Sequence, residues 1–150
     1  MGNHFSKQVF YNGWTPMTLA ARNGSPNIIS FLIRNGADVN AHDRNGLTPL
    51  FASIDGQKTK IVALLLENGA DLTKMDAHGR LPISFAVRKQ ATDIINLLIE
   101  SGADANSSDR TSWSQLTIAI YYGTIEIVSL LIEGVQILTK RINKAVCQLI

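Results

Sequence analysis

The sequence repeats itself with a period of 33 residues, and this period constrains the fold more than any other feature. Three independent sets of residues keep the spacing: Gly13, Gly46 and Gly79; Pro16, Pro49 and Pro82; and Gly36, Gly69 and Gly102. Ser112 and Gln115 fill the fourth slots of the first two sets. Units of this length bury their apolar faces by stacking on one another. The period therefore predicts a solenoid of about four units.

Within each unit, the residue pattern predicts two helices. A Pro, preceded by Thr in the first two units, opens a short first helix, because Pro is preorganised for the first helical turn and Thr can cap it. The second helix carries apolar residues three and four positions apart, which form one wide buried stripe. These runs are Ile28–Ile33, Ile61–Leu66, Ile94–Ile99 and Ile127–Ile132. The Gly that follows supplies the left-handed residue that ends the helix.

Residues 46–50 (Gly-Leu-Thr-Pro-Leu) and 36–40 (Gly-Ala-Asp-Val-Asn) resemble the ankyrin repeat, and the pattern extends from Gly13 to Glu133. The resemblance implies an all-α solenoid of stacked helix-turn-helix units with protruding turn or hairpin loops. The predicted units are residues 13–45, 46–78, 79–111 and 112–134. They follow a leader at residues 1–12.

The chain departs from the family pattern at two kinds of position. The usual His after Thr-Pro-Leu is replaced by other residues, so its local hydrogen bonding must be replaced or lost. The substitutes are Thr18, Phe51, Ser84 and Thr117. The fourth unit has Ser114-Gln115 in place of Thr-Pro, which is expected to weaken the start of its first helix.

Residues 135–150 no longer follow the repeat. Val135 occupies the slot of the helix-ending Gly, and a β-branched residue is unfavourable in a left-handed conformation. Leu138, Ile142 and Leu149 would share one face of a helix. The segment is predicted to be either an amphipathic capping helix or a degenerate repeat.

Little in the sequence indicates catalysis. The three His residues occupy different repeat phases, without a Cys or Glu cluster at metal-ligand spacing. Asp38, Asp71 and Asp104 recur once per repeat beside Gly, so they are predicted to accept backbone N–H groups within loops. No nucleotide-binding or nucleophile motif occurs. We therefore expect no enzyme activity, no cofactor and no metal site.

Charge and cysteine content narrow the class of protein further. A net charge of +2 is too small for a general nucleic-acid binder, which must neutralise many phosphates. The single Cys147 allows no disulfide framework, which indicates a reducing compartment. The first thirty residues hold no apolar run of signal-peptide length. We expect a cytoplasmic monomer.

The positions that the repeat leaves free predict binding to another protein. Proteins of the family that this sequence resembles recognise partners with their loop tips and the exposed side of their first helices. The residues at the matching positions are Trp14, Arg22, Asn23, Arg44, Leu47, Arg80, Arg88, Lys89, Trp113, Tyr121 and Tyr122. Aromatic residues and Arg dominate the energetics of interfaces. The sequence thus predicts a non-enzymatic adaptor, scaffold or inhibitor.

The cations in this set outnumber the nearby Asp55, which predicts a positive binding surface. Its natural complement is a protein partner with acidic and aromatic or aliphatic groups. Two alternatives stay open at this stage. Trp14 and Trp113 would instead shield the core, and the cations would form a scattered, solvated face.

Two possible modifications lie outside the repeat logic. Residues 1–6 fit the N-myristoylation pattern, with Gly2 as the acceptor. An acylated Gly2 would make the chain a membrane-peripheral recruitment module, whereas an unmodified leader would leave it a cytoplasmic binder. Asn40 is similar to the loop asparagine that is hydroxylated in some ankyrin proteins. A further alternative is that the chain is a piece of a longer ankyrin-repeat protein.

Overall fold

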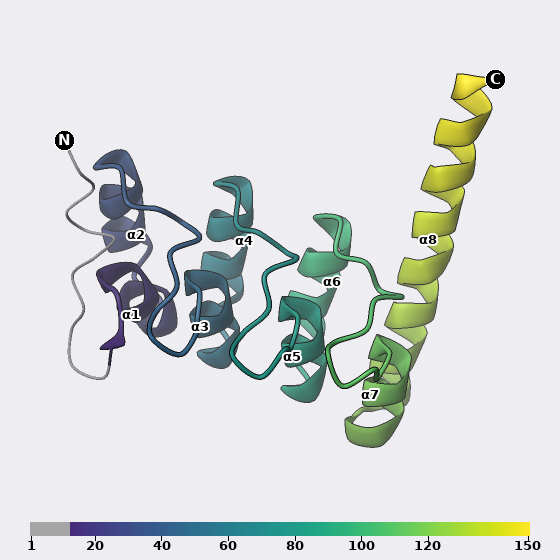
Figure 1. Ribbon diagram of the computed structural model, residues 1–150, viewed down its shortest axis with the longest axis horizontal. Coiled ribbons are helices and arrows are strands. Elements are labelled where there is room, and N and C mark those ends of the chain that lie inside the picture. Colours follow the sequence, from purple (N-terminus) through teal and green to yellow (C-terminus); the bar gives the residue numbers. More distant parts are fainter. Residues whose placement is uncertain (1–12) are drawn as a thin grey trace.

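A computed structural model describes residues 13–150 and shows helices that follow the 33-residue period (Figure 1). The first helices of the repeats are α1 (Pro16–Asn23), α3 (Pro49–Asp55), α5 (Pro82–Arg88) and α7 (Gln115–Tyr122). The second helices are α2 (Pro26–Arg34), α4 (Thr59–Glu67), α6 (Thr92–Glu100) and α8 (Ile125–Leu149). The predicted all-α class and the stacking of helix pairs are confirmed. The predicted leader, with Gly2, lies outside the described residues.

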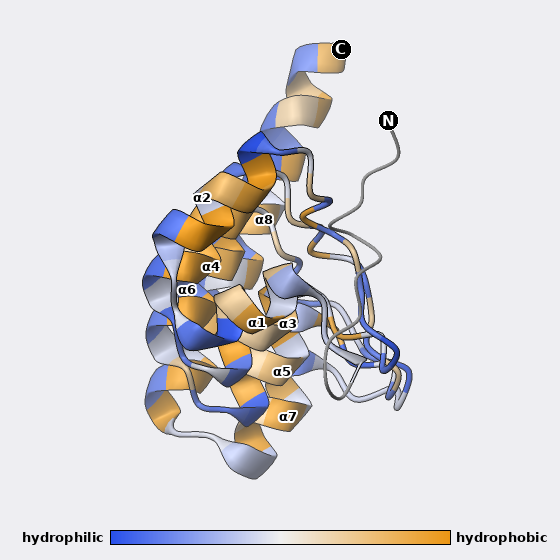
Figure 2. Cartoon of the chain, turned by 90° about the vertical axis from the view of Figure 1, so that its left-hand side faces the viewer, coloured by the Kyte–Doolittle hydropathy of each residue, from blue (hydrophilic) through white to orange (hydrophobic). Residues whose placement is uncertain are grey.

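The repeats form three layers, which Figure 2 shows from one end of the stack. The second helices α2, α4 and α6 lie on one side, the first helices in the middle, and the loops project on the other side. First helices stack on first helices, and second helices on second helices, because successive repeats have the same structure. Side chains at one repeat phase therefore line up across the molecule.

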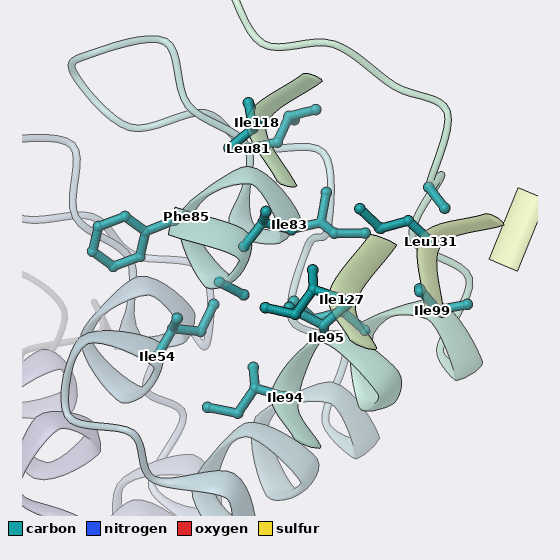
Figure 3. Packing of buried hydrophobic residues seen from close by; sticks show 14 of the residues in the cluster. Ile54, Leu81, Ile83, Phe85, Ile94, Ile95, Ile99, Ile118, Ile127 and Leu131 are labelled. Carbon is teal, nitrogen blue, oxygen red and sulfur yellow. The ribbon is translucent and has the colours of Figure 1, made fainter. Parts of the chain in front are cut away.

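The apolar stripes of the second helices face the first helices and form the core (Figure 3). Ile61, Ile94 and Ile127 occupy one repeat phase, and each is buried. Burying such a side chain stabilises the fold by about 1.5–3 kcal/mol. The core continues between repeats, since the Phe51 and Phe85 rings lie 5.6 Å apart. The buried residues form two clusters along the stack, and Leu47 and Ala70 pack against both of them.

Asp residues order the loops, as the sequence predicts. In three loops, the Asp after Gly-Ala accepts the backbone N–H two residues later at 2.8 Å: Asn40 N–H to Asp38, Thr73 N–H to Asp71 and Asn106 N–H to Asp104. The Thr73 hydroxyl, together with the Thr73 N–H, also lowers the pKa of Asp71 below its ordinary value of 3.8. The loops are therefore held by their own hydrogen bonds.

At Thr18 and at Gln115, other hydrogen bonds compensate for the departures from the family pattern, whereas Phe51 packs in the apolar core. Thr18 N–H donates to Thr15 Oγ1 at 3.1 Å, and Thr15 N–H donates to Thr18 Oγ1 at 2.9 Å, so Thr18 completes a capping box. Gln115 is buried in the slot of the missing Pro, and its Nε2 donates to Ser84 Oγ at 2.8 Å. The expected weak helix start therefore gains a tether to the third repeat.

The predicted separate helix at residues 135–150 is not what the structure shows. Helix α8 continues unbroken from Ile125 to Leu149, and residues 139–150 are exposed rather than packed against the fourth repeat. The earlier second helices end where Gly36, Gly69 and Gly102 adopt positive φ angles. Val135 cannot take that conformation without strain, so the helix continues through the slot. In the structure, residues 135–149 are thus the continuation of α8.

Candidate functional site

Three aromatic side chains of the fourth repeat form a contiguous surface, here called the aromatic patch: Trp113, Tyr121 and Tyr122. The Trp113 and Tyr121 ring centroids lie 5.5 Å apart, and those of Tyr121 and Tyr122 lie 4.8 Å apart. Both pairs meet edge to face, the geometry that aromatic quadrupoles favour. Tyr121 is 70% exposed, so its ring is available to a partner. The structure thus brings three of the predicted binding residues together.

The third repeat holds Tyr122 in place through Arg88 and Gln90. The Arg88 guanidinium carbon lies 5.4 Å from the Tyr122 ring centroid, and Arg88 Nη1 donates to the Tyr122 hydroxyl at 3.4 Å. Gln90 Nε2 donates to the Tyr122 carbonyl oxygen at 2.6 Å. A ring held from its face and from its backbone loses little freedom on binding, which favours a rigid contact surface.

Asp109 fixes Arg88 in turn. Arg88 Nη2 lies 3.1 Å from Asp109 Oδ2, and the Asp109 side chain is fully buried. Burial alone would raise the pKa of the Asp109 carboxyl, but hydrogen bonds from Thr111 and from Arg88 outweigh it and hold this pKa below 3.8. Asp109 therefore stays ionised and paired, and it orients the guanidinium beside Tyr122.

Sequence reasoning missed Asp109 as part of this site. Asp43, Asp76 and Asp109 share one repeat phase, and that spacing identifies the Asp that opens each turn. The repeat position does not determine which cation pairs with the second carboxylate oxygen of each of these Asp residues. In the second turn that oxygen accepts from Arg80 Nε at 2.7 Å, and in the third it meets Arg88. The period was a usable signal for the carboxylate, though not for its partner.

A second group of predicted residues takes part in an ion-pair network that spans the first three repeats. Asp55 on α3 lies 3.4 Å from Arg22 on α1 and 2.7 Å from Lys89, which follows α5. Arg22 also lies over the Trp14 ring, 4.9 Å from its centroid. Asp55 therefore joins three repeats, and it shares its charge between two cations.

Four of the cations that were predicted to make the binding surface positive form ion pairs. Arg22 and Lys89 pair with Asp55, and Arg80 and Arg88 pair with the buried turn carboxylates described above. The sequence analysis set only Asp55 against these cations, so the charges of Asp76 and Asp109 reduce the positive excess that it predicted. Among the described residues, Arg44 and Arg110 take part in no ion pair of this kind. Within the predicted binding surface, the cations without an ion pair therefore lie on two loop tips.

The other predicted residues lie apart from the aromatic patch. Asn23 ends α1 and is exposed, whereas Leu47 is half-buried and packs against the core. Asn40 links the first loop to the second: Asn40 Nδ2 donates to the Gly69 carbonyl oxygen at 3.0 Å, and Asp71 N–H donates to Asn40 Oδ1 at 2.7 Å. The side chain of Asn40 thus has a structural role, and its hydroxylation stays a prediction.

Residues 13–150 contain no group of three or more His, Cys, Asp or Glu side chains that could hold a metal ion. No helix within the same residues is long and apolar enough to cross a lipid bilayer.

Comparison with known proteins bears on the whole stack. The family model described as ankyrin repeats (3 copies) matches two stretches of the chain, residues 2–76 and 74–141. Together these stretches cover all eight helices except the last turns of α8. Among curated proteins, no sequence matches this chain.

Proposed function

This chain belongs to the ankyrin-repeat family, whose repeats mediate protein–protein interactions, and from that premise we propose that it is a non-enzymatic binding module whose main contact is the aromatic patch. The observation that carries the proposal is the continuous set of contacts from Trp113 through Tyr121 and Tyr122 to Arg88. Tyr, Trp and Arg are the residue types most enriched among interface hot spots. The role is that of an adaptor, scaffold or inhibitor.

The chemistry of the patch indicates the kind of partner. The rings offer apolar faces, while the Tyr121 hydroxyl can donate or accept a hydrogen bond. Arg110 lies in the loop before Trp113 and forms no ion pair among the described residues, so a carboxylate can meet it. We therefore propose a protein segment with an aliphatic or aromatic side chain and a neighbouring acidic group.

Alanine substitution tests the proposal. Tyr121→Ala and Trp113→Ala are each expected to weaken partner binding by about 2 kcal/mol, roughly 30-fold, because a buried hot-spot ring loses its contact area. Phe31→Ala is the matched control, since Phe31 is an exposed aromatic residue on α2, far along the stack. Capture from lysates of the producing cells, compared by mass spectrometry across the three variants, identifies the partner, and calorimetry with the purified partner measures its affinity.

The melting temperature separates binding from folding. The wild type and all three variants are expected to melt within a few degrees of one another, because exposed side chains contribute little to stability. If Tyr121→Ala and Trp113→Ala lower the melting temperature strongly and leave the affinity unchanged, the rings belong to the fold and the proposed contact is wrong.

A further inference from the structure

The outer side of the fourth repeat is an uncovered apolar face. Ile120 on α7 is 69% exposed, whereas its counterparts in the two preceding repeats, Ile54 and Val87, are fully buried by the repeat that follows them. Leu116 is 38% exposed, while its counterparts at the same phase are also buried. Terminal repeats of stable solenoids usually carry a polar outer face. This one keeps the residues of an internal repeat, so its apolar face lacks a cover within residues 13–150.

The same face continues along α8. Ile132 is exposed, although its counterpart Ile99 is buried in the third repeat. At 100° per residue, Ile132, Val135, Ile142, Val146 and Leu149 follow one another along a single side of the helix. The last three are exposed. We call this side of α8, together with Leu116 and Ile120, the end face.

The geometry of α8 prevents its tail from covering the end face. Helix α8 has 25 residues, against nine in α6, so it extends about 24 Å further. Figure 1 shows this extension running straight past the ends of α2, α4 and α6. Between α7 and the middle of α8 the end face is hollowed by a cavity of about 220 Å³, lined by Leu116, Leu131, Ile132 and Val135 among others. The cavity and the exposed tail are thus two unfilled parts of one surface.

We propose that the end face pairs with the end face of a second copy of this chain, with the two α8 helices antiparallel. In such a two-fold pair, the tail of each copy lies on the hollowed half of the other, so one contact covers both unfilled parts. A two-fold interface needs a self-complementary patch of this kind. With the axis near residue 137, Ile142 of one copy meets Ile132 of the other.

The end face carries no charged side chain on α8. Glu126, Glu133, Lys140 and Lys144 lie about 140–180° around the helix from it, so the pairing leaves these charges in water. The antiparallel arrangement therefore follows from shape, because only it places the exposed tail of each copy on the hollowed half of the other.

The exposed area fits a reversible dimer. A fully buried aliphatic side chain removes roughly 60–120 Å² from water. Ile125 and Ile150 lie on the same side of α8 at its two ends, so they extend the end face. Its exposed aliphatic side chains are then Leu116, Ile120, Ile125, Ile132, Ile142, Val146, Leu149 and Ile150. They offer on the order of 600 Å² per copy, somewhat below the roughly 800 Å² per partner of a standard interface. We therefore expect a dissociation constant of about 1–100 µM, in place of the monomer expected from sequence.

Sedimentation equilibrium of the full chain between about 1 and 300 µM tests the pairing. The wild type is expected to move from 16.4 kDa towards twice that mass as concentration rises. Ile142→Asp should weaken the dimer at least about 100-fold, because each two-fold contact buries the substitution twice. Ile137→Asp is the matched control, since Ile137 is similarly exposed and lies about 140° around the helix from Ile142. Circular dichroism confirms that both variants fold.

The single cysteine of the chain tests the orientation. Cys147 is exposed and accepts a spin label without further substitution. In the antiparallel pair the two labels lie ten residues from the axis on opposite sides, so their separation is about 30 Å. A separation near 10 Å would show a parallel pair and would contradict the proposed arrangement. The proposal would also be overturned if the wild type stayed monomeric at all concentrations, or if Ile137→Asp weakened the dimer as much as Ile142→Asp does. Binding through another face would likewise leave Ile142→Asp dimeric.

Discussion

Replacing Asp109 by Asn tests whether the buried ion pair supports the fourth repeat. The change keeps the shape of the side chain but removes the charge that faces Arg88 at 3.1 Å. Removing one partner of a fully buried pair costs about 3–5 kcal/mol, and a surface pair contributes about 0–1 kcal/mol. Asp109 is fully buried and Arg88 is about one-fifth exposed, so we expect an intermediate loss of about 2 kcal/mol. For a chain of this length that is roughly 4–8 °C in melting temperature.

Asp43→Asn is the matched control. Asp43 occupies the same repeat phase, is equally buried, and accepts the N–H groups of Asn45 and Leu47 at 2.8 Å. Its Oδ2 finds no hydrogen-bond donor among residues 13–150, so its replacement removes no ion pair. We expect a loss of about 1 kcal/mol or less, measured for both variants by urea unfolding followed by circular dichroism.

The pH dependence gives the same pair a second measurement. Because the folded pKa of Asp109 lies below its unfolded value of 3.8, the ionised carboxyl stabilises the fold fully above that value. This stabilisation is lost as the pH falls through the lowered pKa. Asp109→Asn should therefore flatten the decline in stability below about pH 5. If Asp109→Asn and Asp43→Asn lose the same free energy at pH 7 and show the same acid decline, the ion pair contributes nothing.

Two further predictions concern the start of α7 and the leader. Ser84→Ala should cost about 1 kcal/mol, because buried Gln115 Nε2 loses its acceptor at 2.8 Å and keeps only the longer bond to Ser107 Oγ at 3.3 Å. Ser53→Ala should cost less, because its buried hydroxyl donates within its own helix, and equal urea midpoints for the two variants would contradict the tether. The pattern at Gly2 predicts acylation and reversible membrane attachment, so Gly2→Ala should lack the fatty-acyl mass increment and leave the membrane fraction. If the wild type and Gly2→Ala have the same acyl content and the same fractionation, the prediction is wrong and the cytoplasmic binder remains.

The local structure of the repeats could be predicted because it depends on contacts close in sequence. Asp71 meets the N–H of Thr73 two residues later, and Gly69 takes a positive φ angle directly after α4. Such contacts depend on residue type and spacing alone. The 33-residue period then extends each local result to the neighbouring repeats, so the helix pairs and the stacking order followed from the sequence.

The site was less predictable because its contacts join side chains that are far apart in the sequence. Arg88 and Asp109 are 21 residues apart, and each has other groups of suitable charge at similar phases. Which pair forms depends on rotamers and on the exact spacing of α5 and the following turn. The path of α8 was missed for a related reason. Val135 disfavours the left-handed conformation that ends the other second helices. This does not determine whether the residues after Val135 pack against the fourth repeat or extend away from it.

The fourth repeat depends on the third more than the period alone implies. Hydrogen bonds join them at three places: Gln115 to Ser84, Arg88 to the Tyr122 hydroxyl, and Gln90 to the Tyr122 carbonyl oxygen. In a solenoid each repeat is stabilised mainly by its neighbours, and an end repeat has only one. The aromatic patch lies on that end repeat. The fraction of molecules in which the three rings are correctly placed for binding therefore depends on the stability of this single interface. The cover that we propose for the end face would supply the missing second neighbour.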